Sequence, residues 1–279
     1  MSQPRGRYAP NDRSLVQTAL QDWNSQKSWD AIDQLRLHAS PDTVARLGRL
    51  AASRNWRKRV LALEVVGELH QLDPRHLIFS EYATEEAHKL LLAALDDPHP
   101  KVVESAIFGL GHRPHPAAID RLVALASHPS VDMRNAVAYA LGGYDNEAAI
   151  HALIKLATDS SDIVRDWATF ALGSLSSSDM PAIGEQLWVN TQDPVEDVRI
   201  EAYMGLAARR DSRIIPALEK LMHDPDCHSW VFDAANQLAD AALYPALADA
   251  MGRIDPEHAA DQHWYRHLQS AIEVCKPVI

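Results

Sequence analysis

The chain has 279 residues, of which 47% are hydrophobic but only 6% aromatic, a composition typical of close-packed helices rich in alanine, leucine and valine. Its formal net charge of −11 at pH 7 disfavours nucleic acid as a partner, because phosphate binding needs a basic face. Two cysteines are too few for a disulfide framework or a cysteine zinc site. The sequence has no apolar leader and no apolar run of about eighteen residues, so it predicts a cytoplasmic protein without a membrane span.

The N-terminal region predicts a helix pair that differs from those that follow it. Residues 12–38 carry this divergent pair, and residues 1–40 are assigned to an N-terminal cap. Ser40 and Pro41 then mark a helix start, since serine caps the first turn and proline suits its first position.

Between residues 41 and 240 a short pattern recurs six times. Each copy ends at a small anchor residue, and the anchors are Gly67, Gly111, Gly142, Gly173, Ala207 and Ala239. The anchors are therefore 44, 31, 31, 34 and 32 residues apart. A fixed period of this length is typical of stacked helical repeats. The longer first step predicts an insertion at residues 71–84.

Each repeat predicts two helices joined by a polar break. The first helix carries apolar residues at helical spacing, and the break is rich in Asp, Pro, Ser and His, as in DDPHP at 96–100. The second helix carries the repeated pattern and ends at the anchor, where a small residue eases the turn. Residues 243–252 and 258–275 form a last pair within a C-terminal cap, 241–279. We predict one continuous all-α array, a right-handed α-α superhelix of about seven helix pairs.

Two positions of the second helix are expected to face the core. The fifth position before the anchor is small, and the ninth is mostly apolar and lies on the same helical face. The residues at the fifth position are Ala62, Ala106, Val137, Ala168, Ala202 and Ala234, and those at the ninth are Lys58, Val102, Met133, Val164, Val198 and Trp230.

The repeated pattern D-x-x-V-R-x-x-A-x-x-A-L-G closely resembles HEAT-like repeats of the kind also found in phycobilisome lyases. The resemblance covers residues 41–240 and is strongest at 159–173 and 193–207, where VRDWATFALGS and VRIEAYMGLAARRD are similar to bacterial HEAT-repeat proteins of unassigned function. It implies a HEAT- or armadillo-like solenoid but no single activity, because such families include scaffolds, lyases and glycosylases.

The resemblance also implies a ladder of ion pairs between repeats. The motif arginines are Arg59, Arg134, Arg165 and Arg199, and their candidate acidic partners are Asp97, Asp132, Asp159, Asp162, Asp193 and Asp197.

In such solenoids the second helices line a concave face, where we place the candidate binding site. Large apolar side chains occupy the third position before the anchor in four consecutive repeats, and neighbouring positions add acids and aromatics. The predicted partner-binding residues are Phe108, Tyr139, Asp166, Trp167, Phe170, Glu201, Tyr203 and Met204. Aromatic anchors dominate binding energy at interfaces, and acidic residues steer a basic partner. The alternative is that this stripe packs between adjacent helices as core.

No catalytic residue, cofactor or metal site is predicted. The sequence lacks HExxH, P-loop and GxSxG motifs, and the His263–His267 pair has no acidic third ligand on its helix face. We predict a non-enzymatic scaffold or adaptor that binds a protein partner, a basic one fitting best, with neutralisation of a cognate toxin or enzyme as one form of that role. The sequence leaves the partner and the oligomeric state open.

The alternative functions are enzymatic. Asp166 beside Trp167 superficially fits a HEAT-like DNA glycosylase, but the basic clusters at 54–59 and 209–213 are short and far apart. A phycobilin lyase role depends only on the shared repeat.

Overall fold

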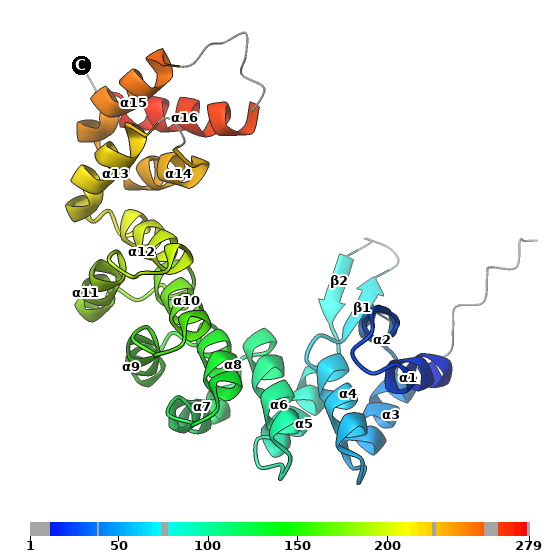
Figure 1. Cartoon of the computed structure of the whole chain (residues 1–279). Coiled ribbons are helices and arrows are strands. Elements are labelled where there is room, and N and C mark those ends of the chain that lie inside the picture. The colour runs from blue at the N-terminus through cyan, green and yellow to red at the C-terminus, as the bar shows by residue number, and fades with distance from the viewer. Residues whose placement is uncertain (1–11, 38, 74–77, 225–226, 254–261, 278–279) are drawn as a thin grey trace, which may run out of the picture. The chain divides into compact units, whose positions relative to one another are not determined.

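The computed structural model describes residues 12–37, 39–73, 78–224, 227–253 and 262–277, together with the side chains in these ranges except those of 72, 73, 262 and 263. It confirms the all-α prediction (Figure 1). The described residues form sixteen α-helices in eight consecutive pairs, one pair more than the seven estimated from the repeats. None of these helices is long and apolar enough to cross a membrane.

The chain divides into two compact units, Met1–Gly143 and Tyr144–Ile279. The boundary falls between the third and fourth anchored repeats, and the regular spacing of the anchors does not mark it. Each unit contains four helix pairs, and the two are described separately below.

The first unit contains four helix pairs and a β-hairpin. Its second helices pack in chain order, α2 on α4, α4 on α6 and α6 on α8. The elements are α1 (Asp12–Gln21), α2 (Gln26–Leu37), α3 (Pro41–Ala51), α4 (Trp56–Val66), β1 (His70–Asp73), β2 (Ile78–Glu81), α5 (Thr84–Ala94), α6 (Pro100–His112), the 3₁₀ turn η1 (Pro116–Ala118), α7 (Ile119–Leu125) and α8 (Val131–Leu141).

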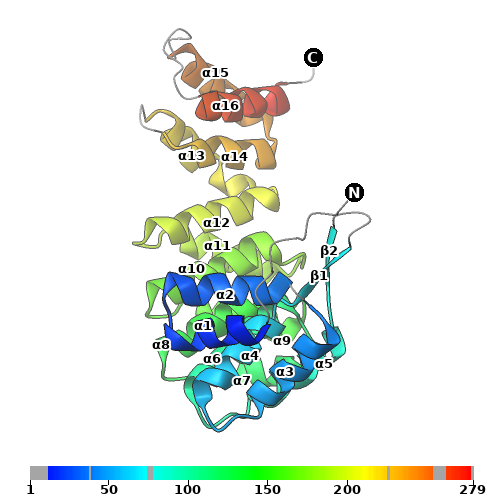
Figure 2. The ribbon, with the colours of Figure 1, turned by 90° about the vertical axis from the view of Figure 1, so that its right-hand side faces the viewer.

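The second unit repeats the same arrangement, with α10, α12, α14 and α16 as its second helices. Figure 2 shows its pairs stacked one on another. The elements are α9 (Glu147–Leu156), α10 (Asp162–Phe170), the π-helical turn η2 (Ala171–Leu175), α11 (Pro181–Asn190), α12 (Glu196–Ala208), η3 (Ser212–Ile214), α13 (Ile215–Met222), α14 (Ser229–Leu238), η4 (Ala241–Leu243), α15 (Tyr244–Gly252) and α16 (Gln262–Cys275).

The insertion predicted at 71–84 contains the β-hairpin. Strands β1 and β2 pair antiparallel, with His70 opposite Glu81 and Gln71 opposite Ser80. Sequence analysis predicted the insertion but no strands, because each strand has only four residues and the segment carries no hairpin-turn motif. Ile78 and Phe79 on β2 are 62% and 48% exposed, so the hairpin leaves apolar surface uncovered.

The two core-facing positions behave as the pattern predicted. All six residues at the fifth position before the anchor are 0% exposed, and four of the six at the ninth are buried. The exceptions at the ninth position are Lys58 and Trp230, which are half-buried. A small fifth residue therefore lets neighbouring second helices approach closely.

Glycine anchors serve helix packing rather than the turn that we predicted for them. A Cβ on Gly67 would lie 2.9 Å from the Gly109 Cα atom, and one on Gly205 would lie 2.5 Å from the Gly173 Cα atom. None of the described glycines has a positive φ. Of the six anchors, Ala239 turns the chain in the left-handed region, with φ 54°.

Each motif arginine binds the turn that precedes its own helix. Its Nη1 donates to the carbonyl six residues earlier: Arg59 to Ser53 (2.8 Å), Arg134 to His128 (2.9 Å), Arg165 to Asp159 (2.9 Å) and Arg199 to Asp193 (2.8 Å). These bonds satisfy carbonyls in a turn that the helices leave without partners.

Two of these arginines also form the expected ladder to the next pair. Arg59 binds Asp97 through two hydrogen bonds of 2.7 and 2.8 Å, and Arg165 binds Asp193 through two of 2.7 and 3.0 Å. Burial alone would raise the pKa of Asp193, but hydrogen bonds from Arg165 and the Val195 amide hold it below the ordinary value. Asp132 instead accepts a hydrogen bond from Lys101, at 3.3 Å.

Candidate partner-binding site

The eight predicted site residues are divided between the two units, and each of them is half-buried. Phe108 and Tyr139 lie in the first unit. The other six, Asp166, Trp167, Phe170, Glu201, Tyr203 and Met204, lie on α10 and α12 of the second unit. We therefore describe two local surfaces.

In the first unit the predicted stripe residues pack on one another. The rings of Phe108 on α6 and Tyr139 on α8 lie 5.4 Å apart. The Tyr139 hydroxyl is within hydrogen-bond distance of His112, at 3.1 Å from Nδ1, and His112 lies 3.4 Å from Glu68. Burial raises the pKa of Tyr139, and Glu68 raises it further. The stripe here thus combines packing between repeats with partial exposure.

In the second unit aromatic side chains follow three successive second helices. Trp167 and Phe170 on α10 meet edge to face at 5.9 Å, and Tyr203 on α12 stacks on Trp230 of α14 at 5.7 Å. Sequence reasoning missed Trp230, because it assigned the ninth position to the core. The indole is larger than the valines and methionine at that position, and it stays half-buried against Tyr203.

Carboxylates lie on the same two helices, α10 and α12. Burial raises the pKa of Asp166 on α10, and the charges of Asp197 and Asp162 raise it further. Burial likewise raises the pKa of Glu201 on α12, followed by the charges of Asp166 and Asp197. Among the described residues, the charges that raise these two pKa values are those of Asp162, Asp166 and Asp197.

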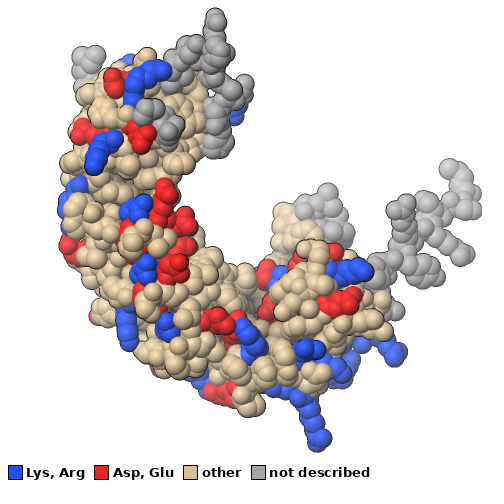
Figure 3. Space-filling model, in the orientation of Figure 1, with Lys and Arg blue, Asp and Glu red and all other residues tan. Residues whose placement is uncertain are grey.

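Figure 3 shows Asp and Glu side chains gathered over α10 and α12. We call this surface the acidic–aromatic face; its residues are Asp162, Asp166, Trp167, Asp197, Glu201 and Tyr203.

Three arginines of the basic clusters that a DNA-binding groove would need are engaged within the protein. Arg209 donates to the carbonyl oxygens of Gly173, Leu172, Gly205 and Ser176. Arg213 contacts Asp211 and Glu185, at 2.6 and 3.0 Å. In the first unit the cluster at 54–59 includes Arg59, which binds Asp97. These three guanidinium groups join parts of the fold.

Metal ligation finds no support within the described ranges, where no group of three His, Cys, Asp or Glu residues has a suitable arrangement. Of the two histidines at i and i+4, the His263 side chain lies outside the described residues. The His267 Nδ1 contacts the Asp233 carboxylate.

The first unit also contains a pocket that sequence reasoning missed, lined by Trp23, Trp29, Trp56 and Glu64 among others. These residues come from the N-terminal cap and the first anchored repeat. One available signal was the concentration of tryptophan before residue 60, where three of the chain's seven tryptophans lie.

Comparison with known proteins identifies the repeat. Residues 88–173 match the family model for HEAT repeats. The chain contains HEAT repeats. Protein YibA from Escherichia coli strain K12 is 34% identical to it over 64 residues, which are 23% of this chain and 23% of YibA. The X-ray structure of E. coli YibA covers 96% of this chain and 93% of its own, with 25% identity and a TM-score of 0.71.

Another solved structure is more distant. The complex of CpcE and CpcF of phycocyanin lyase from Nostoc sp. PCC7120 is 17% identical, covers 98% of both chains and has a TM-score of 0.48, a likeness too weak to bear on activity. The curated YibA match spans about a quarter of that protein, and its name states no activity. The comparisons therefore establish HEAT repeats in residues 88–173 and a fold shared with YibA, and function must be argued from surfaces.

Proposed function

We propose that this HEAT-repeat protein is a non-enzymatic adaptor that binds a basic protein partner through the acidic–aromatic face of its second unit. The observation that supports this most is the cluster of carboxylates around Asp166 and Glu201. Like charges near one another destabilise a fold, and groups with perturbed pKa values concentrate at functional sites.

A basic partner would supply what the face lacks. A lysine or arginine placed between Asp166 and Glu201 relieves their repulsion, and it favours the ionised form of both. Trp167 and Tyr203 beside them add large apolar area, which carries much of the binding energy at interfaces. Charge therefore selects the partner and steers its approach, while the aromatic rings hold it.

Binding of a basic protein has more support than base excision. A DNA glycosylase needs a basic groove to hold phosphates, but Arg59, Arg209 and Arg213 are engaged within the fold. The carboxylates on the acidic–aromatic face would repel a nucleic acid backbone.

Affinity capture from extract of the source cells tests the proposal. The wild-type chain is compared with Asp166→Asn/Glu201→Gln and with Trp167→Ala/Tyr203→Ala. The matched control is Glu147→Gln/Glu273→Gln, which removes the same charge from exposed positions elsewhere in the second unit. A basic protein retained by the wild type and the control, and lost from both site variants, is the expected result.

Calorimetry with the purified partner then measures the effect. Each site variant should weaken binding by at least about tenfold, equal to about 1.4 kcal/mol, while the helical circular dichroism spectrum stays unchanged. If the retained protein binds both site variants as tightly as the wild type, the acidic–aromatic face is not its binding site. If Trp167→Ala/Tyr203→Ala unfolds the second unit, these rings serve as core.

A further inference from the structure

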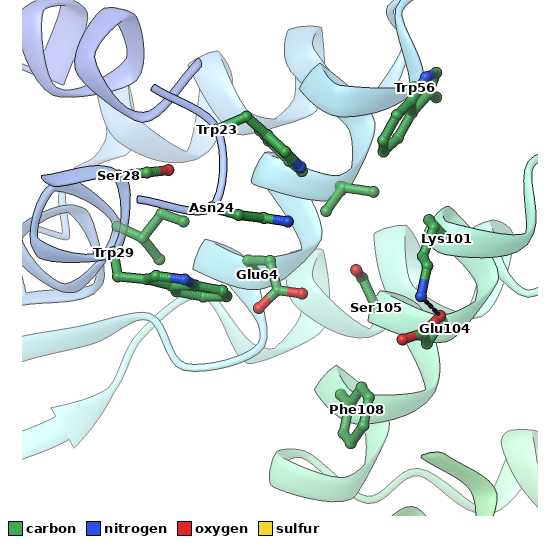
Figure 4. Close-up of a pocket in the computed structure, with 12 residues that line it drawn as sticks. Trp23, Asn24, Ser28, Trp29, Trp56, Glu64, Lys101, Glu104, Ser105 and Phe108 are labelled. Carbon is green, nitrogen blue, oxygen red and sulfur yellow. Dashed lines mark hydrogen bonds and ion pairs between the residues drawn. The ribbon is translucent and has the colours of Figure 1, made fainter. Parts of the chain in front are cut away.

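A pocket of about 350 Å³ lies among α2, α4 and α6 of the first unit (Figure 4). We call it the tryptophan pocket; its lining includes Trp23, Trp29, Trp56, Glu64, Glu104 and Phe108. Its volume falls within the range of small-molecule sites, about 300–1,000 Å³. All its residues belong to the first unit, so it is separate from the acidic–aromatic face.

Aromatic rings form much of the wall. Trp23, just before α2, meets Trp56 edge to face at 5.8 Å, and Trp56 stacks on His99 at 4.3 Å. Trp29 on α2 remains 39% exposed. Figure 4 shows these indoles together with Phe108 arranged around the pocket. Several large rings left partly uncovered around one hollow are typical of a binding site rather than of a closed core.

The rim of this pocket already attracts a cation. The Arg57 guanidinium carbon lies 5.4 Å from the Trp56 ring centre and 5.9 Å from that of Trp23. Both distances are within the range of cation–π attraction, about 6 Å. The indole faces therefore present negative potential to a charged neighbour.

The carboxylate of Glu64 lines the same pocket, and its negative charge is only partly balanced by a nearby cation. The Arg36 Nη2 atom lies 3.6 Å from a carboxylate oxygen of Glu64 but only 2.9 Å from one of Glu68. Arg36 therefore forms its closer ion pair with Glu68. Burial raises the pKa of Glu64, although Ser105 and Arg36 oppose that shift. The other acid of the pocket, Glu104, is bound by Lys101 at 2.8 Å. Glu64 thus lines the pocket and shares its ion-pair partner Arg36 with Glu68.

We propose that the tryptophan pocket binds a small organic cation with an alkylated ammonium head, held against the indole faces beside the Glu64 carboxylate. An anion would meet Glu64 and Glu104. A neutral apolar ligand would cover Glu64 without giving it a partner, which is costly for a buried charge. A hard metal ion takes oxygen ligands and gains little from indoles. An alkylated ammonium group matches both the rings and the acid.

Nuclear magnetic resonance of the full chain labelled with ¹⁵N tests this proposal. The indole N–H resonances of Trp23, Trp29 and Trp56 are assigned by single replacements with phenylalanine. Choline is then titrated at constant ionic strength beside 3,3-dimethylbutan-1-ol, its neutral isostere. We expect saturable shifts of these indole signals with choline, with a Kd of about 1 mM or tighter. The neutral isostere should bind at least about tenfold more weakly.

Variants of the pocket provide the controls. Glu64→Gln should weaken choline binding at least tenfold, whereas Glu86→Gln, an exposed acid of α5 outside the pocket, should leave it unchanged. Trp29→Ala should abolish binding and Trp29→Phe should restore part of it, so the test still holds if Glu64→Gln fails to fold. A short peptide with trimethyllysine, titrated in parallel, distinguishes a protein side chain from a free small molecule as the source of the cation.

Two results would overturn the proposal. One is the absence of saturable indole shifts with both choline and the trimethyllysine peptide. The other is equal binding of choline and its neutral isostere, which would make the pocket a simple apolar cavity. Neither result bears on the acidic–aromatic face, whose test uses different residues and a protein partner.

Discussion

The two units share one set of structural contacts but differ in the charges on their second helices. Both have a bidentate arginine–aspartate bridge between pairs, Arg59–Asp97 in the first and Arg165–Asp193 in the second. In the first unit, however, Arg36 and Lys101 accompany the acids Glu64 and Glu104. In the second, Asp166 and Glu201 face other acids.

This difference shows which positions of the repeat are structural and which remain available for binding. The fifth residue before the anchor, the glycine contacts and the motif arginines maintain packing in both units. The third, fourth, sixth and seventh positions vary. They supply Glu64, Glu104 and Phe108 to the tryptophan pocket of one unit, and Asp166, Trp167, Glu201 and Tyr203 to the acidic–aromatic face of the other. The predictions below test whether the shared contacts contribute equally to the stability of the two units. They also test whether the clustered acids lower the stability of the second unit.

The glycine contacts should show the largest effect. Gly205→Ala would place a Cβ 2.5 Å from the Gly173 Cα atom, and backbone cannot move aside cheaply, so we expect a loss of about 2–3 kcal/mol in the free energy of unfolding. Gly109→Ala in the first unit meets the Leu91 side chain, which can rotate, and should cost about 1 kcal/mol.

Urea unfolding measures both variants, with Gly48→Ala as control. Nothing lies within 4 Å of a Cβ at Gly48, inside α3, so alanine there should stabilise by about 0.5–1 kcal/mol. Equal losses for Gly205→Ala and Gly109→Ala would show that the two glycine contacts do not differ in rigidity.

The arginine–aspartate bridges should come next in size. Side chains of Arg165 and Asp193 are 14% and 8% exposed, and a double-mutant cycle with Arg165→Met and Asp193→Asn should give a coupling energy of about 1–2 kcal/mol. The Arg59–Asp97 bridge has similar exposure and should give a similar value.

Lys101 and Asp132, which are 51% and 67% exposed, provide the comparison pair. Their coupling should not exceed about 0.5 kcal/mol, because water screens an exposed ion pair. If the coupling energy of Arg165 and Asp193 is no larger than this, their bridge does not stabilise the fold more than an exposed ion pair does.

The acidic–aromatic face should give the smallest effect, with an unusual sign. Asp166 and Glu201 have pKa values raised from 3.8 and 4.5. Their contribution to stability is therefore complete below those values and is lost as the pH rises through the raised ones. Asp166→Asn/Glu201→Gln should raise the Tm at pH 7 by about 2 °C and leave it unchanged at ~pH 3, below both ordinary values.

Asp193 gives the opposite sign, because its pKa is lowered. Its contribution is present above the ordinary value of 3.8 and is lost as the pH falls through the lowered one. Calorimetric scans between ~pH 3 and ~pH 7 compare the wild type with Asp166→Asn/Glu201→Gln and with Asp193→Asn. They distinguish stability that is lost as the pH rises from stability that is lost as the pH falls. A lower Tm for Asp166→Asn/Glu201→Gln at pH 7 would mean that these carboxylates stabilise the fold. That would contradict the proposal that their mutual repulsion lowers its stability.

Much of the fold could be predicted because the repeat is local. The repeat consists of apolar residues at helical spacing, polar breaks, and small residues at the fifth position before the anchor, such as Ala168. These features act within one helix or between adjacent helices, so the sequence alone reveals them. Asp97 and Asp193 were named as ladder acids for the same reason, since they occupy equivalent turns. The hairpin in the insertion was missed, because strands of four residues carry too little periodic signal.

The sequence by itself determined the helix pairs, their core positions and the candidate residues on α10 and α12. Only the tertiary structure decided that glycine anchors such as Gly173 serve close helix packing, that Trp230 stacks on Tyr203, and that the indoles near the N-terminus line one pocket with Glu64. The physical reason is the sequence separation of the interacting residues. Helix periodicity depends on residues three or four positions apart, whereas the exposure of a ring and the partner of a charge depend on which other helices pack beside them.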